Sequence, residues 1–146
     1  MDSREASALV LDAIGYAVAG DAERAADTIA TLGTGSDANL MYGACCALAE
    51  AGKFALQKIY GEQAARPEQG DMWVFEQLQP GALDGDPAKA FAMRFLVAYC
   101  NGDTDTTLAL WVASLKASDE EHVDSVCALL VNVAGIVRLA IEQQAD

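Results

Sequence analysis

One stretch near the C-terminus, residues 118–141, limits the folds open to this chain more than any other. It reads SDEEHVDSVCALLVNVAGIVRLAI. Ser118 and Glu121 have the spacing of a capping box, in which each side chain accepts a hydrogen bond from a free backbone N–H at the start of a helix. We therefore predict a helix over these 24 residues, about 36 Å long at 1.5 Å per residue.

The second part of this stretch, residues 126–141, is almost wholly apolar. Asn132 and Arg138 are its only strongly polar residues. Because a helix that is apolar on nearly every side is normally buried on nearly every side, we expect it to be the central helix of the fold. We do not expect a membrane span, because the unbroken apolar run is shorter than the roughly 20 residues that a span needs.

The composition favours helix along the rest of the chain. The 146 residues include 29 alanines, the residue that costs least to place in a helix, and only three prolines. No segment shows a sustained alternation of apolar and polar residues, so no sheet is predicted. We predict a single all-α domain over residues 1–146, a compact bundle of about six to seven helices.

Capping residues, glycines and prolines mark the helix boundaries. Gly52 is expected to end or bend the third helix, and a connector over residues 66–85 carries Trp73 and Phe75 together with turns at Pro80-Gly81 and Asp84-Gly85. The predicted helices before the C-terminal one run over residues 3–19, 22–32, 37–65, 71–78, 87–101 and 104–115.

A shift of 82 residues aligns the chain with itself at several boundary and core positions. We therefore consider an internal duplication, with three-helix units over residues 1–65 and 86–146 packed about a pseudo-twofold axis. The alternative is chance, because an alanine-rich chain readily matches itself. The aligned positions are Gly20-Asp21 with Gly102-Asp103, Ser36-Asp37 with Ser118-Asp119, Cys45 with Cys127, Leu48 with Leu130 and Ile59 with Ile141.

The strongly acidic balance restricts the partners. The net charge is −13, from 22 acidic and 9 basic residues. Such a field repels nucleic-acid backbones and anionic membranes, so we expect neither as a partner. We expect a homodimer, through spare apolar surface, or a protein partner with a basic face. Mimicry of DNA would need carboxylates in rows on an exposed face, whereas these cluster at helix starts and loops.

No motif for catalysis, metal binding or cofactor binding occurs in the sequence. His122 is the only histidine, which excludes metal sites built on two histidines. There is no phosphate-binding glycine loop, no nucleophile elbow and no CxxC pair. From these missing motifs we expect no catalytic residues, no metal and no cofactor. The N-terminus lacks a basic region followed by an apolar run, so we expect a cytoplasmic protein with reduced thiols. The cysteines, all in apolar surroundings, are Cys45, Cys46, Cys100 and Cys127.

Five residues remain as candidates for binding. If buried, Asn132 needs an internal hydrogen bond, and Arg138 either snorkels near the helix end or binds an acidic ligand. His122 either lies in a solvated first helical turn or contributes to a ligand site. Trp73 and Phe75 either fill the core from the connector or anchor a partner, since tryptophan is enriched at binding hot spots.

Two hypotheses about function follow. The first is a non-enzymatic, acidic helical interaction or scaffold protein, which predicts helices with two apolar tracks and no deep polar pocket. The alternative is a small-molecule-binding protein or enzyme with a pocket between the two helical halves. That alternative predicts an aromatic-lined cavity with Arg138, His122 or a carboxylate pointing inward.

Overall fold

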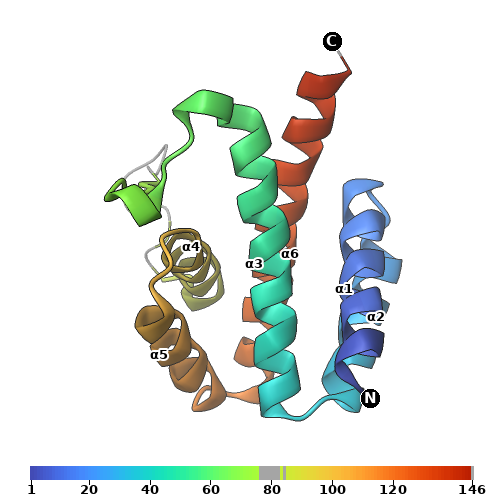
Figure 1. The fold of residues 1–146 in the computed structure, drawn as a ribbon. Helices are drawn as coiled ribbons and strands as arrows, with labels where there is room; N and C mark the ends of the chain where they lie inside the picture. Colours follow the sequence, from blue (N-terminus) through green and yellow to red (C-terminus); the bar gives the residue numbers. More distant parts are fainter. Residues whose placement is uncertain (76–82, 84, 146) are drawn as a thin grey trace.

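The structure, a computed structural model, describes residues 1–75, 83 and 85–145. These residues form α-helices and short 3-10 helices without a strand, which confirms the predicted all-α bundle (Figure 1). In chain order the elements are α1 (Ser3–Val18), α2 (Ala22–Gly35), α3 (Ala38–Tyr60), η1 (Gly61–Gln63), η2 (Pro67–Gln69), α4 (Pro87–Cys100), α5 (Thr104–Leu115) and α6 (Asp119–Gln144).

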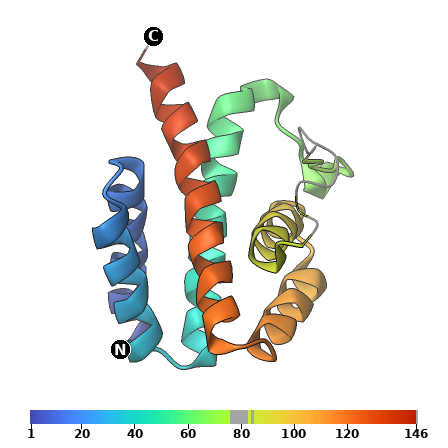
Figure 2. The same ribbon diagram turned by 180° about the vertical axis from the view of Figure 1, so that it is seen from behind.

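The two longest helices, α3 and α6, lie side by side along the middle of the molecule and run in the same direction (Figures 1 and 2). The α1–α2 hairpin lies along one side of this pair, and α4 and α5 lie on the other side. Both α1 and α4 contact α3 and α6, so the long pair is covered from two sides. The core therefore forms around α3 and α6.

Each α-helix begins directly after a residue whose side chain caps its first turn. Ser118 Oγ accepts a hydrogen bond from Glu121 N at 3.2 Å, which confirms the serine contact of the predicted capping box. The other five α-helices begin after an aspartate whose carboxylate accepts from the backbone N–H three residues later. Much of the acidic charge therefore serves helix starts. These aspartates are Asp2, Asp21, Asp37, Asp86 and Asp103.

Gly52 does not end the third helix, because α3 continues to Tyr60, and the predicted bend at this residue stays a prediction. A Cβ atom on Gly52 would lie 3.1 Å from Leu96 Cδ1 on α4 and 3.3 Å from Val133 Cγ2 on α6. The glycine therefore lets three helices approach closely at this point. Its role is packing rather than a break in the helix.

The C-terminal helix α6 is central, and it contacts each of the other five α-helices. One face nevertheless stays open, because α2 touches α6 only sparsely. Val123 and Val131 are 51% and 67% exposed on this face, so the expected burial on nearly every side does not hold. By length and composition α6 is long and apolar enough to cross a membrane. Core helices of soluble proteins can have the same length and composition.

Residues 71–75 of the connector have no regular secondary structure, so the predicted helix over 71–78 is wrong there. Asn101 Oδ1 accepts from Trp73 N at 2.6 Å, and Asn101 Nδ2 donates to Trp73 O at 3.0 Å. These bonds satisfy backbone groups that a helix would have paired internally. Residues 76–78, and Pro80, Gly81 and Asp84 of the predicted turns, lie outside the described residues.

The two proposed halves share local structure at an offset of 82. Gly20 and Gly102 both have positive φ, at 82° and 71°. In each half the following aspartate donates its backbone N–H to a carbonyl five residues earlier, at 2.9 Å. The first two helices of each half nevertheless lie differently: the α1–α2 hairpin runs along α3, whereas α4 crosses it (Figure 1). The duplication stays a prediction.

Candidate binding groove between α2 and α6

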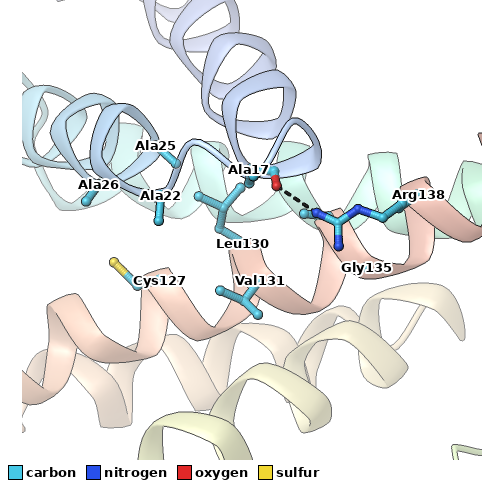
Figure 3. Close-up of a pocket in the computed structure, with 11 residues that line it drawn as sticks. Ala17, Ala22, Ala25, Ala26, Cys127, Leu130, Val131, Gly135 and Arg138 are labelled. Carbon is cyan, nitrogen blue, oxygen red and sulfur yellow. Dashed lines mark hydrogen bonds between the residues drawn. The ribbon is translucent and has the colours of Figure 1, made fainter.

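Two adjoining cavities lie between α2 and α6, with volumes of about 520 Å³ and 330 Å³. Ala26 and Cys127 line both cavities, so the two adjoin, and we call them together the α2–α6 groove. Figure 3 shows the residues that line the smaller cavity. Its walls are Ala22, Ala26, Ala30 and Gly33 of α2 and Val123, Cys127, Val131, Gly135 and Arg138 of α6.

The α2 wall consists of small residues because the larger apolar residues of α2 face the core. Ile29 and Leu32 are 4% and 0% exposed, whereas Ala22, Ala26 and Ala30 are exposed. The alanines recur every four residues, so they lie along one line of the helix. A partner can approach the α2 backbone closely along this line.

The α6 wall is larger and apolar. Val123 and Val131 project at the edge of the groove, while Leu130 and Ala134 lie at its floor and are both 3% exposed. From Val123 to Arg138 the groove follows α6 for about 22 Å at 1.5 Å per residue. This length equals about four turns of a helix.

Arg138 closes one end of the groove and holds the end of α1. Its Nη2 donates to Ala17 O at 3.0 Å (Figure 3). The same Nη2 donates to Val18 O at 3.1 Å, and Nε donates to Val18 O at 3.3 Å. The last carbonyls of a helix have no partner within that helix and carry partial negative charge. The guanidinium is therefore a cap supplied from a distant helix, and the acidic ligand considered for it stays a prediction.

His122 lies at the opposite end of the groove, in the larger cavity. Its Nδ1 is 2.9 Å from Ser114 Oγ on α5, and its ring meets the Trp111 ring edge-on at 4.9 Å between centroids. Ser114 is only 8% exposed. Within the described residues no hydrogen bond joins a carboxylate to this histidine, so the pair lacks the orienting acid of a hydrolase triad.

Asn132 takes no part in the groove. Its side chain is exposed and lines neither cavity, so it does not need the internal hydrogen bond expected for a buried asparagine. The groove thus brings together Arg138 and His122, at its two ends, and leaves Asn132 outside.

Trp73 and Phe75 lie on the far side of the molecule from the groove, in the connector. Trp73 is 8% exposed and packs edge-on against Tyr60, with centroids 5.7 Å apart. Phe75 is half-buried and packs against the core. This burial favours the core-filling alternative for both, and their assignment to a partner site stays a prediction. The exposed side chains of the segment are Met72 and Val74.

Cys127 is the one thiol among the groove-lining residues. Burial, with a smaller effect of the nearby Asp124 carboxylate, raises the pKa of this half-buried thiol. The thiol therefore stays protonated near neutral pH and is a poor nucleophile. Among the described residues no group of three His, Cys, Asp or Glu side chains is placed to hold a metal ion.

Carboxylates flank the groove. Glu23 and Asp27 follow Ala22 and Ala26 directly on α2, and Asp124 follows Val123 on α6. Neighbouring residues of a helix lie about 100° apart, so these exposed carboxylates stand beside the groove rather than inside it. Asp37 and Asp119 line the end near His122.

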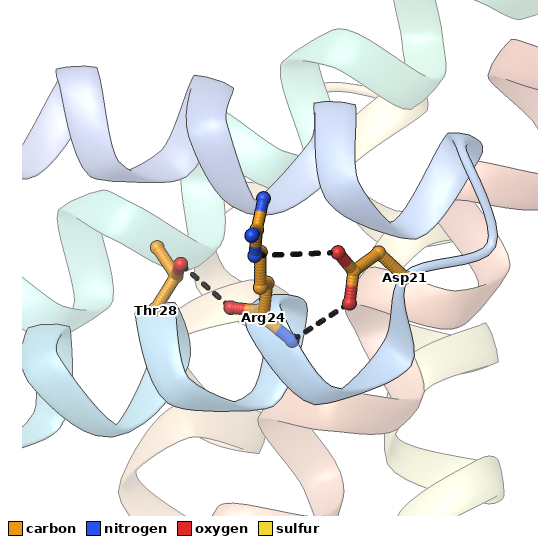
Figure 4. Close-up of polar contacts among 3 residues, drawn as sticks. All are labelled: Asp21, Arg24 and Thr28. Atoms are coloured by element: carbon orange, nitrogen blue, oxygen red, sulfur yellow. Dashed lines mark hydrogen bonds and ion pairs between the residues drawn. The ribbon is translucent and has the colours of Figure 1, made fainter.

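The only base of α2, Arg24, faces away from the groove. Its Nε lies 3.5 Å from Asp21 Oδ2 (Figure 4). Its guanidinium lies 5.9 Å from the centre of the Tyr16 ring on α1. Thr28 adds a hydrogen bond to the Arg24 carbonyl at 2.8 Å. The carboxylates on the α2 rim are therefore not neutralised from within α2.

Sequence reasoning singled out Arg138 and His122, which line the two ends of the groove, and it missed the α2 wall. The signal was the four-residue spacing of the alanines, which in an alanine-rich chain does not stand out. No protein-family model, curated protein or solved structure matches this chain. The choice of the groove as the candidate site therefore depends on its geometry alone.

Proposed function

We propose that this protein is an acidic, non-enzymatic interaction protein whose α2–α6 groove binds an amphipathic helix of a partner with basic flanks. One observation carries the proposal: an apolar floor lies between a wall of small residues and rims of carboxylates. Helices dock in this way, with the apolar face in a groove and charged residues along its edges.

Size and charge both fit such a partner. A groove of about 22 Å accommodates about 15 residues of helix at 1.5 Å per residue. Lysines or arginines on either side of the apolar stripe would lie opposite Glu23, Asp27 and Asp124. Oppositely charged rims speed association and select against acidic partners.

A set of 16-residue helical peptides with a leucine and alanine stripe and lysine flanks provides the test. We expect fluorescence anisotropy to show binding that weakens with salt. Ala26→Leu fills the point that the two cavities share and should weaken binding at least tenfold. Ala8→Leu, at an exposed alanine of α1, is the matched control and should leave binding unchanged. Equal affinity of the two variants, or no binding of any peptide by the unaltered protein, contradicts the proposal.

A second candidate is a small-molecule site in the larger cavity alone. Its volume of about 520 Å³ lies within the range of ligand pockets, and it carries Trp111 and His122 between the two halves of the chain. Ala22→Leu separates the two candidates, because Ala22 lines only the smaller cavity. This variant should weaken a bound helix, whereas it should leave a retained small molecule, seen by native mass spectrometry, in place.

A further inference from the structure

A second surface, on α5, has its apolar and polar residues arranged in the opposite way to an ordinary surface helix. The inward positions Thr107 and Ser114 carry hydroxyls and are 2% and 8% exposed. The outward positions are apolar: Leu108, Val112 and Leu115 are 48%, 43% and 46% exposed. A surface helix usually buries its apolar side chains and exposes its polar ones.

The inward hydroxyls fix this orientation of α5. Thr107 Oγ1 lies 2.9 Å from Tyr42 OH on α3, and Ser114 Oγ lies 2.9 Å from His122 Nδ1 on α6. Between them Trp111 is 3% exposed and packs against the Tyr42 ring. Turning the helix to bury its leucines would leave these hydroxyl partners unpaired, which is costly for buried polar groups.

The outward residues form a line suited to another helix. Leu108, Val112 and Leu115 have the i, i+4, i+7 spacing of a single helical face. Ala109 and Ala113 lie beside them and form a shallow cleft of about 460 Å³ with the flanking charges of Asp105 and Lys116. The larger side chains therefore alternate with hollows.

The charges on this face favour a second copy of the same chain. Asp105 lies at the start of α5 and Lys116 directly follows its end. If two α5 helices pack antiparallel, Asp105 of each copy lies near Lys116 of the other. A parallel arrangement would place like charges together. Two chains of net charge −13 repel each other elsewhere, whereas these two side chains cancel.

We propose that two copies of this chain associate through α5, with Leu108, Val112 and Leu115 of each copy packed across an antiparallel, two-fold helix pair. Such an interface repeats the same patch on both copies, as two-fold interfaces do. One helix of 12 residues presents a small area, so the dimer is weak and depends on concentration. Leu115 also lines the larger cavity of the α2–α6 groove, so the two surfaces meet at this residue. Leu108 and Val112 line neither cavity, so a substitution at Val112 tests the dimer apart from the groove.

Sedimentation velocity over a series of protein concentrations tests the dimer. The unaltered chain should shift from monomer to dimer as concentration rises, and Val112→Glu should raise the dissociation constant at least tenfold. Leu11→Glu, at a 69% exposed leucine of α1, is the matched control and should dimerise like the unaltered chain. A monomer at all concentrations, or a dimer unaffected by Val112→Glu, overturns the proposal.

Charge exchange tests the antiparallel geometry without touching the apolar line. Lys116→Glu should weaken the dimer, because it places two carboxylates together at both ends of the helix pair. Adding Asp105→Lys to this variant restores opposite charges and should recover dimerisation. If the double variant stays as weak as Lys116→Glu while circular dichroism shows an intact fold, the antiparallel pairing is wrong. Unchanged peptide binding by Val112→Glu would show that the groove functions separately.

Discussion

Replacing Gly52 by alanine tests how tightly α3 packs against its neighbours. The new Cβ would lie 3.1 Å from Leu96 Cδ1 and 3.3 Å from Val133 Cγ2, closer than the roughly 3.5–4.0 Å of a favourable carbon contact. Leu96 and Val133 are 1% and 0% exposed, so neither side chain has open space to move into.

Two effects of opposite sign determine the result. Alanine inside a helix is about 1 kcal/mol more favourable than glycine. Overpacking a filled core costs about 1–3 kcal/mol. We therefore expect Gly52→Ala to give no net stabilisation, and Gly52→Val, with two further methyl groups, to destabilise by about 2–3 kcal/mol. At Gly43, also within α3, an added Cβ would meet no atom within 4 Å, so Gly43→Ala should stabilise by about 1 kcal/mol.

Urea unfolding followed by far-UV circular dichroism measures these differences. The informative quantity is the gap between Gly43→Ala and Gly52→Ala, expected to be at least about 1 kcal/mol, because both substitutions share the same helix and the same propensity gain. Equal stabilisation at the two sites would refute the close approach of α4 and α6 to Gly52. Gly52 would then have no packing role and would be only an unfavourable residue that the helix tolerates.

Two further predictions concern the core. Burial, with a smaller effect of Cys46, raises the pKa of Cys45 from 9.0 to about 12. The free energy of unfolding should therefore not depend on the titration of Cys45 below pH 9, and it should fall by on the order of 4 kcal/mol as the pH rises to about 12. Urea unfolding of Cys45→Ala should show a smaller fall over the same pH range. Trp73→Ala should cost about 3–5 kcal/mol in thermal unfolding, because the ring is buried. Trp73→Phe should cost much less stability, because the buried Nε1 has no hydrogen-bond partner among the described residues. A near-normal melting temperature for Trp73→Ala would instead indicate that Trp73 anchors a partner.

The helix starts were predictable because capping is local. Asp103 and Ser118 each lie three residues before the N–H that they bind, so the sequence alone contains both partners. The close approach at Gly52 is different, since Leu96 and Val133 lie more than 40 residues away. From the local sequence, a glycine in a helical segment can mark either a break in the helix or a point of close packing. The positions of distant helices decide which of the two it is.

The candidate site was predictable only at its ends. Arg138 stood out as a polar residue within an apolar run and His122 as the only histidine, and both line the groove. Their partners, the Val18 carbonyl and the Ser114 hydroxyl, could not be assigned, because they belong to other helices. The open face of α6 was missed for the same reason: composition shows that a helix is apolar and does not show how many neighbours cover it.

The offset of 82 residues connects the two proposed surfaces. It places Ala26, Ala30 and Gly33 on Leu108, Val112 and Leu115, so the exposed wall of the groove and the exposed line of α5 occupy equivalent positions. The inward positions correspond as well: Ala25, Ile29 and Leu32 fall on Thr107, Trp111 and Ser114, and all six are buried.

This correspondence is the one that a duplication would leave, and a duplication would relate the two proposed surfaces to each other. In both halves the second helix has the same side turned to the core. Side-chain size makes the two outward faces different in shape. Small residues on α2 leave a groove that another helix can enter, whereas Leu108 and Val112 on α5 project and need a surface to cover them. The buried residues differ as well, since Ile29 corresponds to Trp111 and Leu32 to Ser114, so the two halves keep the same inward side of the second helix with different buried contacts.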